Sequence, residues 1–269
     1  MVSLQSLGRE VLFDCMKASA FRQRKRRSAF LALAVGLAGG LLLLVFAVLL
    51  GGLHLTSFNR RFHPTMPRKD NIYELPANLP VPVDDGACDH LAGSQLPSVP
   101  LFSTAAHQVD LSSLAGTTVV YCYPRTGRPD QELPKGWNEI PGARGCTPQS
   151  CAFRDHYQQL QALGVRVFGL STQDTDYQRE AVQRLHLPFE LLSDSELAFT
   201  RTLRLPTFQV EGMTLIKRLT LIIDGGRITK VFYPVFPPDK NAAEVIQWLS
   251  VHRSPESLKN PPQTHPRDS

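Results

Sequence analysis

The sequence predicts an α/β fold with a mixed central sheet flanked by helices. Three observations lead to this prediction. Strand-like runs of β-branched and aromatic residues alternate with segments of helical spacing. A hairpin turn follows the last long apolar run, and one more helical segment comes after it. Hydrophobic residues make up 42% of the 269 residues, which is enough for a sizeable core.

Each element has its own local signal. The first strand is a buried run that stops at Pro124, and the first helix repeats apolar side chains at Phe153, Tyr157 and Leu160. The tripeptide Asp224-Gly225-Gly226 supplies the hairpin turn. In chain order, the expected elements are a strand over 117–123, a helix over 147–163, strand 165–170, helix 176–185, long strand 214–223, returning strand 228–233 and helix 241–251.

An almost wholly apolar segment, Ala29–Leu53, is long enough to cross a hydrocarbon core of roughly 30 Å. It predicts an uncleaved transmembrane anchor over 29–54. One alternative is a signal peptide, although the apolar region is long for one and no small-x-small cleavage site follows it. The other is translation from Met66, which would leave a cytoplasmic enzyme without the anchor.

The distribution of basic residues indicates which kind of partner the chain has and how the expected anchor is oriented in the membrane. The chain has a formal net charge of +5 and a pI near 9.0, with a basic cluster over 22–27 directly before the apolar segment. A membrane flank explains this cluster better than nucleic-acid binding does, because no stripe of basic and aromatic residues follows it. The positive-inside bias favours an inside N-terminus and an outside catalytic domain. The expected organisation is a basic segment 1–28, the anchor 29–54, a linker 55–84, a domain over 85–252 and a disordered tail 253–269.

Two of the five cysteines, Cys146 and Cys151, are the candidate redox centre. An odd number of cysteines does not suit a disulfide-stapled secreted scaffold. Cys146 stands where a glycine-rich loop gives way to a helix, with Pro148 in the first turn. The N–H groups of a helix start favour a thiolate. The C-x4-C spacing by itself is also compatible with two unrelated buried cysteines, and it does not match a zinc-binding spacing.

Four ordered motifs resemble those of the Q-type peroxiredoxins, the bacterioferritin-comigratory-protein-like branch of the redoxin superfamily. The first joins Gly145-Cys146-Thr147 to Cys151-Ala152-Phe153-Arg154-Asp155. The others are the strand stretch 164–172 (GVRVFGLST), the stretch 188–194 (PFELLSD) and the strand 218–224 (RLTLIID). The resemblance runs from about residue 85 to residue 249.

The resemblance implies a thioredoxin-like fold and reduction of hydrogen peroxide and organic hydroperoxides, with thioredoxin as the usual electron donor. It implies that Cys146 is the peroxidatic cysteine, that Cys151 is the resolving cysteine and that Arg218 holds the thiolate and polarises the peroxide. On an ideal helix the two cysteine Cα atoms lie roughly 8.6 Å apart, beyond the reach of a disulfide. We therefore expect the first turn of the helix to unwind in each catalytic cycle.

One departure from the family motif concerns the active-site hydroxyl. Peroxiredoxins usually carry Pro-x3-Thr/Ser-x2-Cys, but Ala143 stands three residues before Cys146 and Pro124 lies 22 residues before it. An insertion over 125–140 fills the gap. Thr126 is the candidate for a replacement hydroxyl, and a surface turn residue is the alternative interpretation.

The remaining expectations are simpler. Cys122 is expected to be a buried structural thiol. Cys88 lies in a loop, and a role as a spare resolving thiol is the less favoured alternative. For Cys15, palmitoylation and no function are both open, and no function is favoured. No cofactor, metal or nucleic acid is expected, and the protein is expected to be a monomer or weak dimer. The alternative functions are a membrane-anchored thiol–disulfide oxidoreductase, which normally has C-x-x-C, and a non-catalytic redox-fold binding module.

Overall fold

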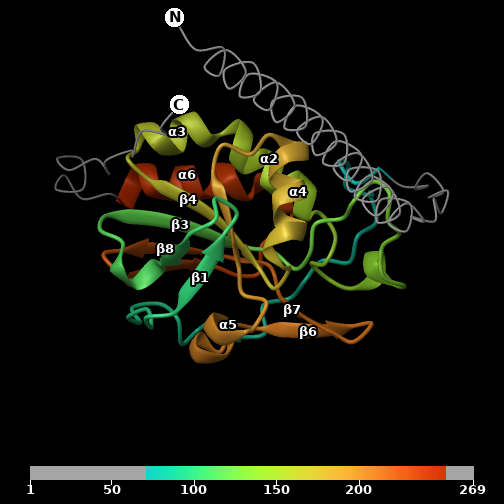
Figure 1. Ribbon diagram of the computed structural model, residues 1–269, viewed down its shortest axis with the longest axis horizontal. Helices are drawn as coiled ribbons and strands as arrows, with labels where there is room; N and C mark the ends of the chain where they lie inside the picture. Colours follow the sequence, from blue (N-terminus) through green and yellow to red (C-terminus); the bar gives the residue numbers. More distant parts are fainter. Residues whose placement is uncertain (1–70, 253–269) are drawn as a thin grey trace, which may run out of the picture. The chain divides into compact units, whose positions relative to one another are not determined.

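The structure, a computed structural model, describes residues 71–252. Its centre is a seven-stranded sheet in the order β2-β1-β5-β4-β3-β8-β9 (Figure 1). β3 pairs in parallel with β4, and β4 with β5, whereas the other pairs are antiparallel, so the predicted mixed sheet is confirmed. The strands are β1 (Pro100–Ser103), β2 (Gln108–Asp110), β3 (Thr117–Cys122), β4 (Arg166–Ser171), β5 (Glu190–Ser193), β8 (Leu219–Asp224) and β9 (Arg227–Phe232).

The helices differ from the prediction mainly in one division. The single helix expected over 147–163 is wrong, because the chain leaves helical geometry at His156, with φ −96° and ψ 6°. His156 N–H closes the first of the two resulting helices by donating to Ala152 O at 3.1 Å. The helices are α2 (Cys146–Asp155), α3 (Tyr157–Ala162), α4 (Thr175–Leu185), α5 (Ala198–Leu203) and α6 (Asn241–His252), with short 3-10 turns η1 (Leu111–Ser113), η2 (Trp137–Glu139) and η3 (Pro238–Lys240).

The sheet separates two hydrophobic cores, because successive side chains of a strand point to opposite faces. Along β3, Val119 and Tyr121 enter one core, while Val120 and Cys122 enter the other. The first core is covered by α2, α3, α4 and α6, and we call this side the four-helix face. The second core takes in Phe199 of α5, and we call this side the α5 face (Figure 1).

A second, two-stranded sheet corrects another prediction. β6 (Thr207–Val210) and β7 (Met213–Ile216) form an antiparallel hairpin outside the main sheet. The long strand expected over 214–223 is therefore wrong, because it contains both β7 and β8. Lys217 and Arg218 lie between the two strands, and Lys217 N–H donates to Pro206 O at 2.8 Å. The run of apolar and β-branched residues conceals this break, and Arg218 stands at it.

Residues 71–85 contain no helix or strand and pack against the loop that precedes α2. Arg144 donates from Nη2 to Asn71 O at 2.7 Å, and Ile72 is buried. This part of the predicted linker thus contacts the loop that leads to Cys146.

The expected transmembrane anchor over 29–54 and the expected tail over 253–269 lie outside the described residues. Among residues 71–252, no helix is both long enough and apolar enough to cross a membrane.

Candidate active site

Gly145 determines where α2 begins. Its φ of +102° lies in the left-handed region, which glycine adopts without steric cost. A side chain there would collide with Pro238, and its Cβ would lie 2.7 Å from Leu75. Cys146 follows as the first residue of α2 and is only 3% exposed. The structure thus places Cys146 at a helix start, as the sequence predicts, where the free N–H groups carry partial positive charge.

Arg218 brings a full positive charge to this thiol. Its Nη2 lies 3.1 Å from Cys146 Sγ, and the side chain is buried. Within residues 71–252 no carboxylate pairs with Arg218. Its positive charge therefore faces the sulfur without a competing anion in this part of the chain.

The guanidinium also shapes the loop before α2. It donates to the carbonyl oxygens of Gly142 at 3.2 Å, Ala143 at 3.1 Å and Arg144 at 3.2 Å. The thiol of Cys146 itself donates to Ala143 O at 3.6 Å. One buried cation thus fixes both the loop backbone and the sulfur that follows it.

A buried amide network extends from Arg218 into α6. Arg218 Nη1 donates to Gln149 Oε1, and Gln149 Nε2 donates to Asn241 Oδ1 at 3.0 Å. Thr220 Oγ1 donates to the same Asn241 oxygen at 2.7 Å. Sequence reasoning missed both Gln149 and Asn241, although Gln149 stands three residues after Cys146 and therefore on the same side of the helix.

Cys151 lies on the same helix and is half-buried. Burial raises the pKa of its thiol, and Arg154 opposes part of that increase. Both cysteines are free thiols, and α2 is intact from Cys146, with Gln149 N–H donating to Gly145 O at 3.0 Å. In this conformation the spacing along the helix keeps the two cysteines too far apart for a disulfide.

Thr126 is fully buried, which does not fit the interpretation as a surface turn residue. Its hydroxyl donates to Gln173 Oε1 at 3.1 Å, and its backbone N–H donates to the same oxygen at 2.9 Å. Gln173 therefore fixes the position of Thr126, and its Oε1 accepts the hydrogen bond that the hydroxyl donates.

The insertion packs against Ala143, which stands where the family motif has a threonine or serine. Ala143 is fully buried in a small apolar cluster with Trp137, Val210 and Leu215. Trp137 comes from η2 in the insertion, and the other two residues come from the β6–β7 hairpin. The cluster therefore covers the loop next to Cys146 with apolar side chains.

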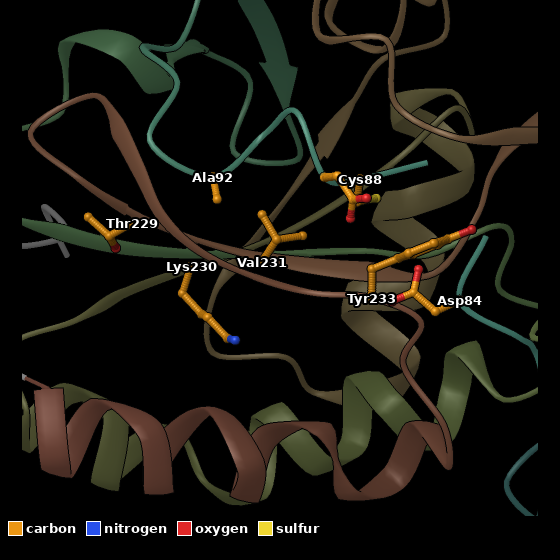
Figure 2. A pocket seen from close by; sticks show the side chains of 8 residues that line it. Asp84, Cys88, Ala92, Thr229, Lys230, Val231 and Tyr233 are labelled. Carbon is orange, nitrogen blue, oxygen red and sulfur yellow. The ribbon is translucent and has the colours of Figure 1, made fainter. Parts of the chain in front are cut away.

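The two other described cysteines lie on the opposite face of the sheet. Cys88 and Cys122 belong to the core of the α5 face. Burial raises the pKa of both thiols, to about 12 for Cys88, where the nearby carboxylates Asp85, Asp84 and Asp89 add to the effect. Cys88 borders an open cavity of about 520 Å³ together with Asp84, Lys230 and Tyr233 (Figure 2). Neither thiol is placed to resolve an intermediate on Cys146, and the expected structural role of Cys122 fits its burial.

Comparison with known proteins identifies the family. A family model described as Redoxin matches residues 91–246. Peroxiredoxin Q, chloroplastic, of Oryza sativa subsp. japonica is 31% identical over 159 residues, which are 58% of this chain and 65% of that protein. The peroxiredoxin Q of Sedum lineare is 31% identical over 58% of this chain and 76% of its own length. The chain therefore belongs to the redoxin family and, within it, to the Q-type peroxiredoxins.

Solved structures agree with the fold. The structure of peroxidoxin BcpB from Mycobacterium tuberculosis superposes with a TM-score of 0.50 at 22% identity and covers 61% of this chain and 98% of its own. A cysteine-to-serine mutant of PrxQ from Xylella fastidiosa gives 0.50 at 21% identity, covering 60% and 96%. The thioredoxin-like fold is thus confirmed, and the two alternative functions considered from the sequence are not favoured. The match spans less than two thirds of the rice protein.

The predicted localisation requires a correction. A single-span, membrane-anchored protein was expected, but no helix within residues 71–252 could cross a membrane. The similar proteins of Oryza sativa and Sedum lineare are described as chloroplastic peroxiredoxins Q. On these findings the prediction of membrane localisation is wrong. It rested on the apolarity of 29–54 alone, and those residues lie outside the described part of the chain.

Proposed function

We propose that this protein is a thiol-dependent peroxidase that reduces hydrogen peroxide and organic hydroperoxides. The observation that carries the proposal is the contact of 3.1 Å between Arg218 Nη2 and Cys146 Sγ at the start of a helix. A cation and a helix start both stabilise a thiolate, and the thiolate is the nucleophile that attacks a peroxide.

The first step oxidises Cys146 by two electrons. The thiolate attacks one peroxide oxygen, the O–O bond breaks, and the sulfur becomes a sulfenic acid. The other oxygen leaves as water or an alcohol after it takes up one proton. Arg218 has a second role here, because its N–H groups stabilise the negative charge that develops on the leaving oxygen.

The second step uses Cys151 as the resolving thiol. Its sulfur displaces the hydroxyl of the Cys146 sulfenic acid, which releases water and leaves a Cys146–Cys151 disulfide. The start of α2 unwinds so that the sulfurs come within bonding distance. Thioredoxin or a similar dithiol then reduces the disulfide and is itself oxidised to a disulfide.

Thr126 is proposed as the hydroxyl that orients the peroxide in place of the missing residue at Ala143. Its hydroxyl donates a hydrogen bond to Gln173 Oε1, which leaves the lone pairs of Thr126 Oγ1 to accept a hydrogen bond from a peroxide O–H. We also propose that the protein works as a monomer or a weak dimer.

The test is stopped-flow peroxide reduction by the parent protein and two variants. Cys146→Ser is expected to abolish reduction. Cys151→Ser is expected to retain one turnover but to lose recycling by thioredoxin. Full activity of Cys146→Ser would exclude the proposed mechanism.

A further inference from the structure

The Gln149 amide lies between Arg218 and Asn241, and its two ends differ in hydrogen-bonding character. The carbonyl oxygen can only accept, and the nitrogen can only donate. In the structure the oxygen faces Arg218 and the nitrogen faces Asn241 Oδ1. If the amide turned over, its donor would face the guanidinium of Arg218, which also has only donors, and the contact would be lost.

Asn241 supplies the preference for one orientation. Its Oδ1 accepts from both Gln149 Nε2 and Thr220 Oγ1. Gln149 Nε2 can only donate, so the end of the Asn241 side chain that faces it is the acceptor, and Thr220 Oγ1 donates to the same oxygen. An acceptor at this position requires the nitrogen of Gln149 to face it, and the oxygen of Gln149 must then face Arg218.

The two ends of the Asn241 amide differ in how their hydrogen-bonding capacity is used. Asn241 is fully buried as the first residue of α6. Within the described residues its Nδ2 has no hydrogen-bond partner. A buried donor without a partner is destabilising, whereas the oxygen at the other end of the amide accepts from Gln149 Nε2 and Thr220 Oγ1. The acceptor oxygen is thus the feature that distinguishes asparagine at this position.

We propose that Asn241 is a positioning residue for the reaction at Cys146. It holds the Gln149 amide with the oxygen toward Arg218, and Gln149 in turn keeps the guanidinium on the sulfur. The chain of contacts runs from Asn241 through Gln149 and Arg218 to Cys146, and Asn241 itself touches no reacting atom. This inference rests on the proposed peroxidase function and extends it to the start of α6.

The test replaces Asn241 by leucine, which has a similar shape but no acceptor. The pH dependence of Cys146 alkylation by iodoacetamide is followed by mass spectrometry, alongside the rate of hydrogen peroxide reduction. We expect the alkylation profile to move to higher pH, because Arg218 is held less firmly on the sulfur. Peroxide reduction is expected to slow several-fold. If Asn241→Leu does not fold, Asn241→Ala is measured in its place.

The matched control is Ser250→Ala on the exposed side of α6, which is expected to leave both readouts unchanged. A double-mutant cycle with Gln149→Met tests the route of the effect. Once Gln149 is replaced, Asn241→Leu is expected to add no further shift. An unchanged midpoint in Asn241→Leu, or a full additional shift in the Gln149→Met protein, would overturn the proposal.

The alkylation readout separates this proposal from the peroxidase function. It reports the Cys146 thiolate without any peroxide present. A shifted midpoint in a protein that reduces no peroxide would support the positioning role and contradict the peroxidase. Peroxidase activity with an unshifted midpoint in Asn241→Leu would support the peroxidase function and contradict the positioning role.

Discussion

At the residue scale, Arg218 is the centre of the site. Its guanidinium contacts the sulfur of Cys146, three loop carbonyls and Gln149. A buried arginine without an acidic partner would ordinarily be destabilising. Here the hydrogen bonds to carbonyl oxygens solvate the charge, and the thiolate of Cys146 becomes its counter-ion when the proton leaves.

Thr126→Ala is expected to slow peroxide reduction several-fold. The substitution removes the proposed hydrogen-bond acceptor for the peroxide, and it leaves Gln173 Oε1 bonded to the backbone N–H of residue 126. Stopped-flow rates over a range of peroxide concentrations provide the measurement. A second-order rate constant equal to that of the parent would remove Thr126 from the mechanism.

The residues of the site differ in how far the sequence reveals them. Cys146, Cys151 and Arg218 are carried by motifs, and the sequence places them on a helix start and at a strand. Gln149 and Asn241 are ordinary polar residues of helices in the sequence. Their role depends on the tertiary contact of α2, α6 and β8 around Arg218, and no local sequence pattern predicts that contact.

At the scale of elements, the proposed mechanism requires the start of α2 to adopt two conformations, one helical and one unwound. The intact helix places Cys146 against Arg218, but it also keeps Cys151 out of bonding distance. Gln149 joins this first turn to α6, so the turn cannot unwind without breaking that hydrogen bond. Under the proposed mechanism, the fold stabilises the conformation that reacts with peroxide, and oxidation of Cys146 supplies the free energy to leave it.

Hydrogen exchange is expected to be faster at residues 146–152 in the oxidised protein than in the reduced protein. The disulfide requires the backbone hydrogen bonds of this turn to open, whereas those of α4 remain closed. The measurement compares both forms by mass spectrometry, with α4 as the internal reference. Equal protection of residues 146–152 in the two forms would contradict the unwinding.

Gly145→Ala is expected to destabilise the protein more than Gly116→Ala does. Both glycines have positive φ, and strain of that kind costs about 1 to 3 kcal/mol. Only at Gly145 would the new Cβ also collide with Pro238 and Leu75, whereas nothing lies within 4 Å of it at Gly116. Urea unfolding of the two variants measures the difference in unfolding free energy. Equal losses of unfolding free energy in the two variants would mean that η3 shifts away from α2 at little cost.

The errors in the predicted elements have physical causes. Apolar and β-branched residues stand on both sides of Lys217 and Arg218 in the sequence, so β7 and β8 resemble one long strand, although the chain leaves one sheet for the other at these two residues. The division between α2 and α3 at His156 has no proline or glycine to signal it. Both breaks are imposed by tertiary packing, so patterns of hydrophobicity do not report them.

At the scale of the whole molecule, the sheet separates the reactive thiols from the others. Cys146 and Cys151 pack on the four-helix face, while Cys88 and Cys122 lie on the α5 face. Burial holds the pKa of Cys88 at about 12, so this thiol stays protonated at neutral pH. This separation agrees with the proposal that oxidation is confined to Cys146 and Cys151.

The raised pKa of Cys88 predicts a loss of stability at alkaline pH. The folded state keeps this proton up to a pH of about 12, whereas the unfolded chain releases it near the ordinary value of 9.0. The stabilising contribution is thus complete below about pH 9 and is lost as the pH rises from there toward 12. We expect Cys88→Ala to have a smaller decrease of unfolding free energy between pH 9 and 11 than the parent. Parallel pH profiles from urea unfolding would contradict this linkage.

The central claim is that Cys146 attacks the peroxide and that Cys151 resolves the product. A single-turnover reaction with one equivalent of hydrogen peroxide, followed by peptide mapping, tests both parts in one sample. The account predicts one disulfide joining Cys146 to Cys151, with Cys88 and Cys122 still reduced. A disulfide that involves Cys88 or Cys122, or a peroxide consumed while Cys146 remains a thiol, would contradict it.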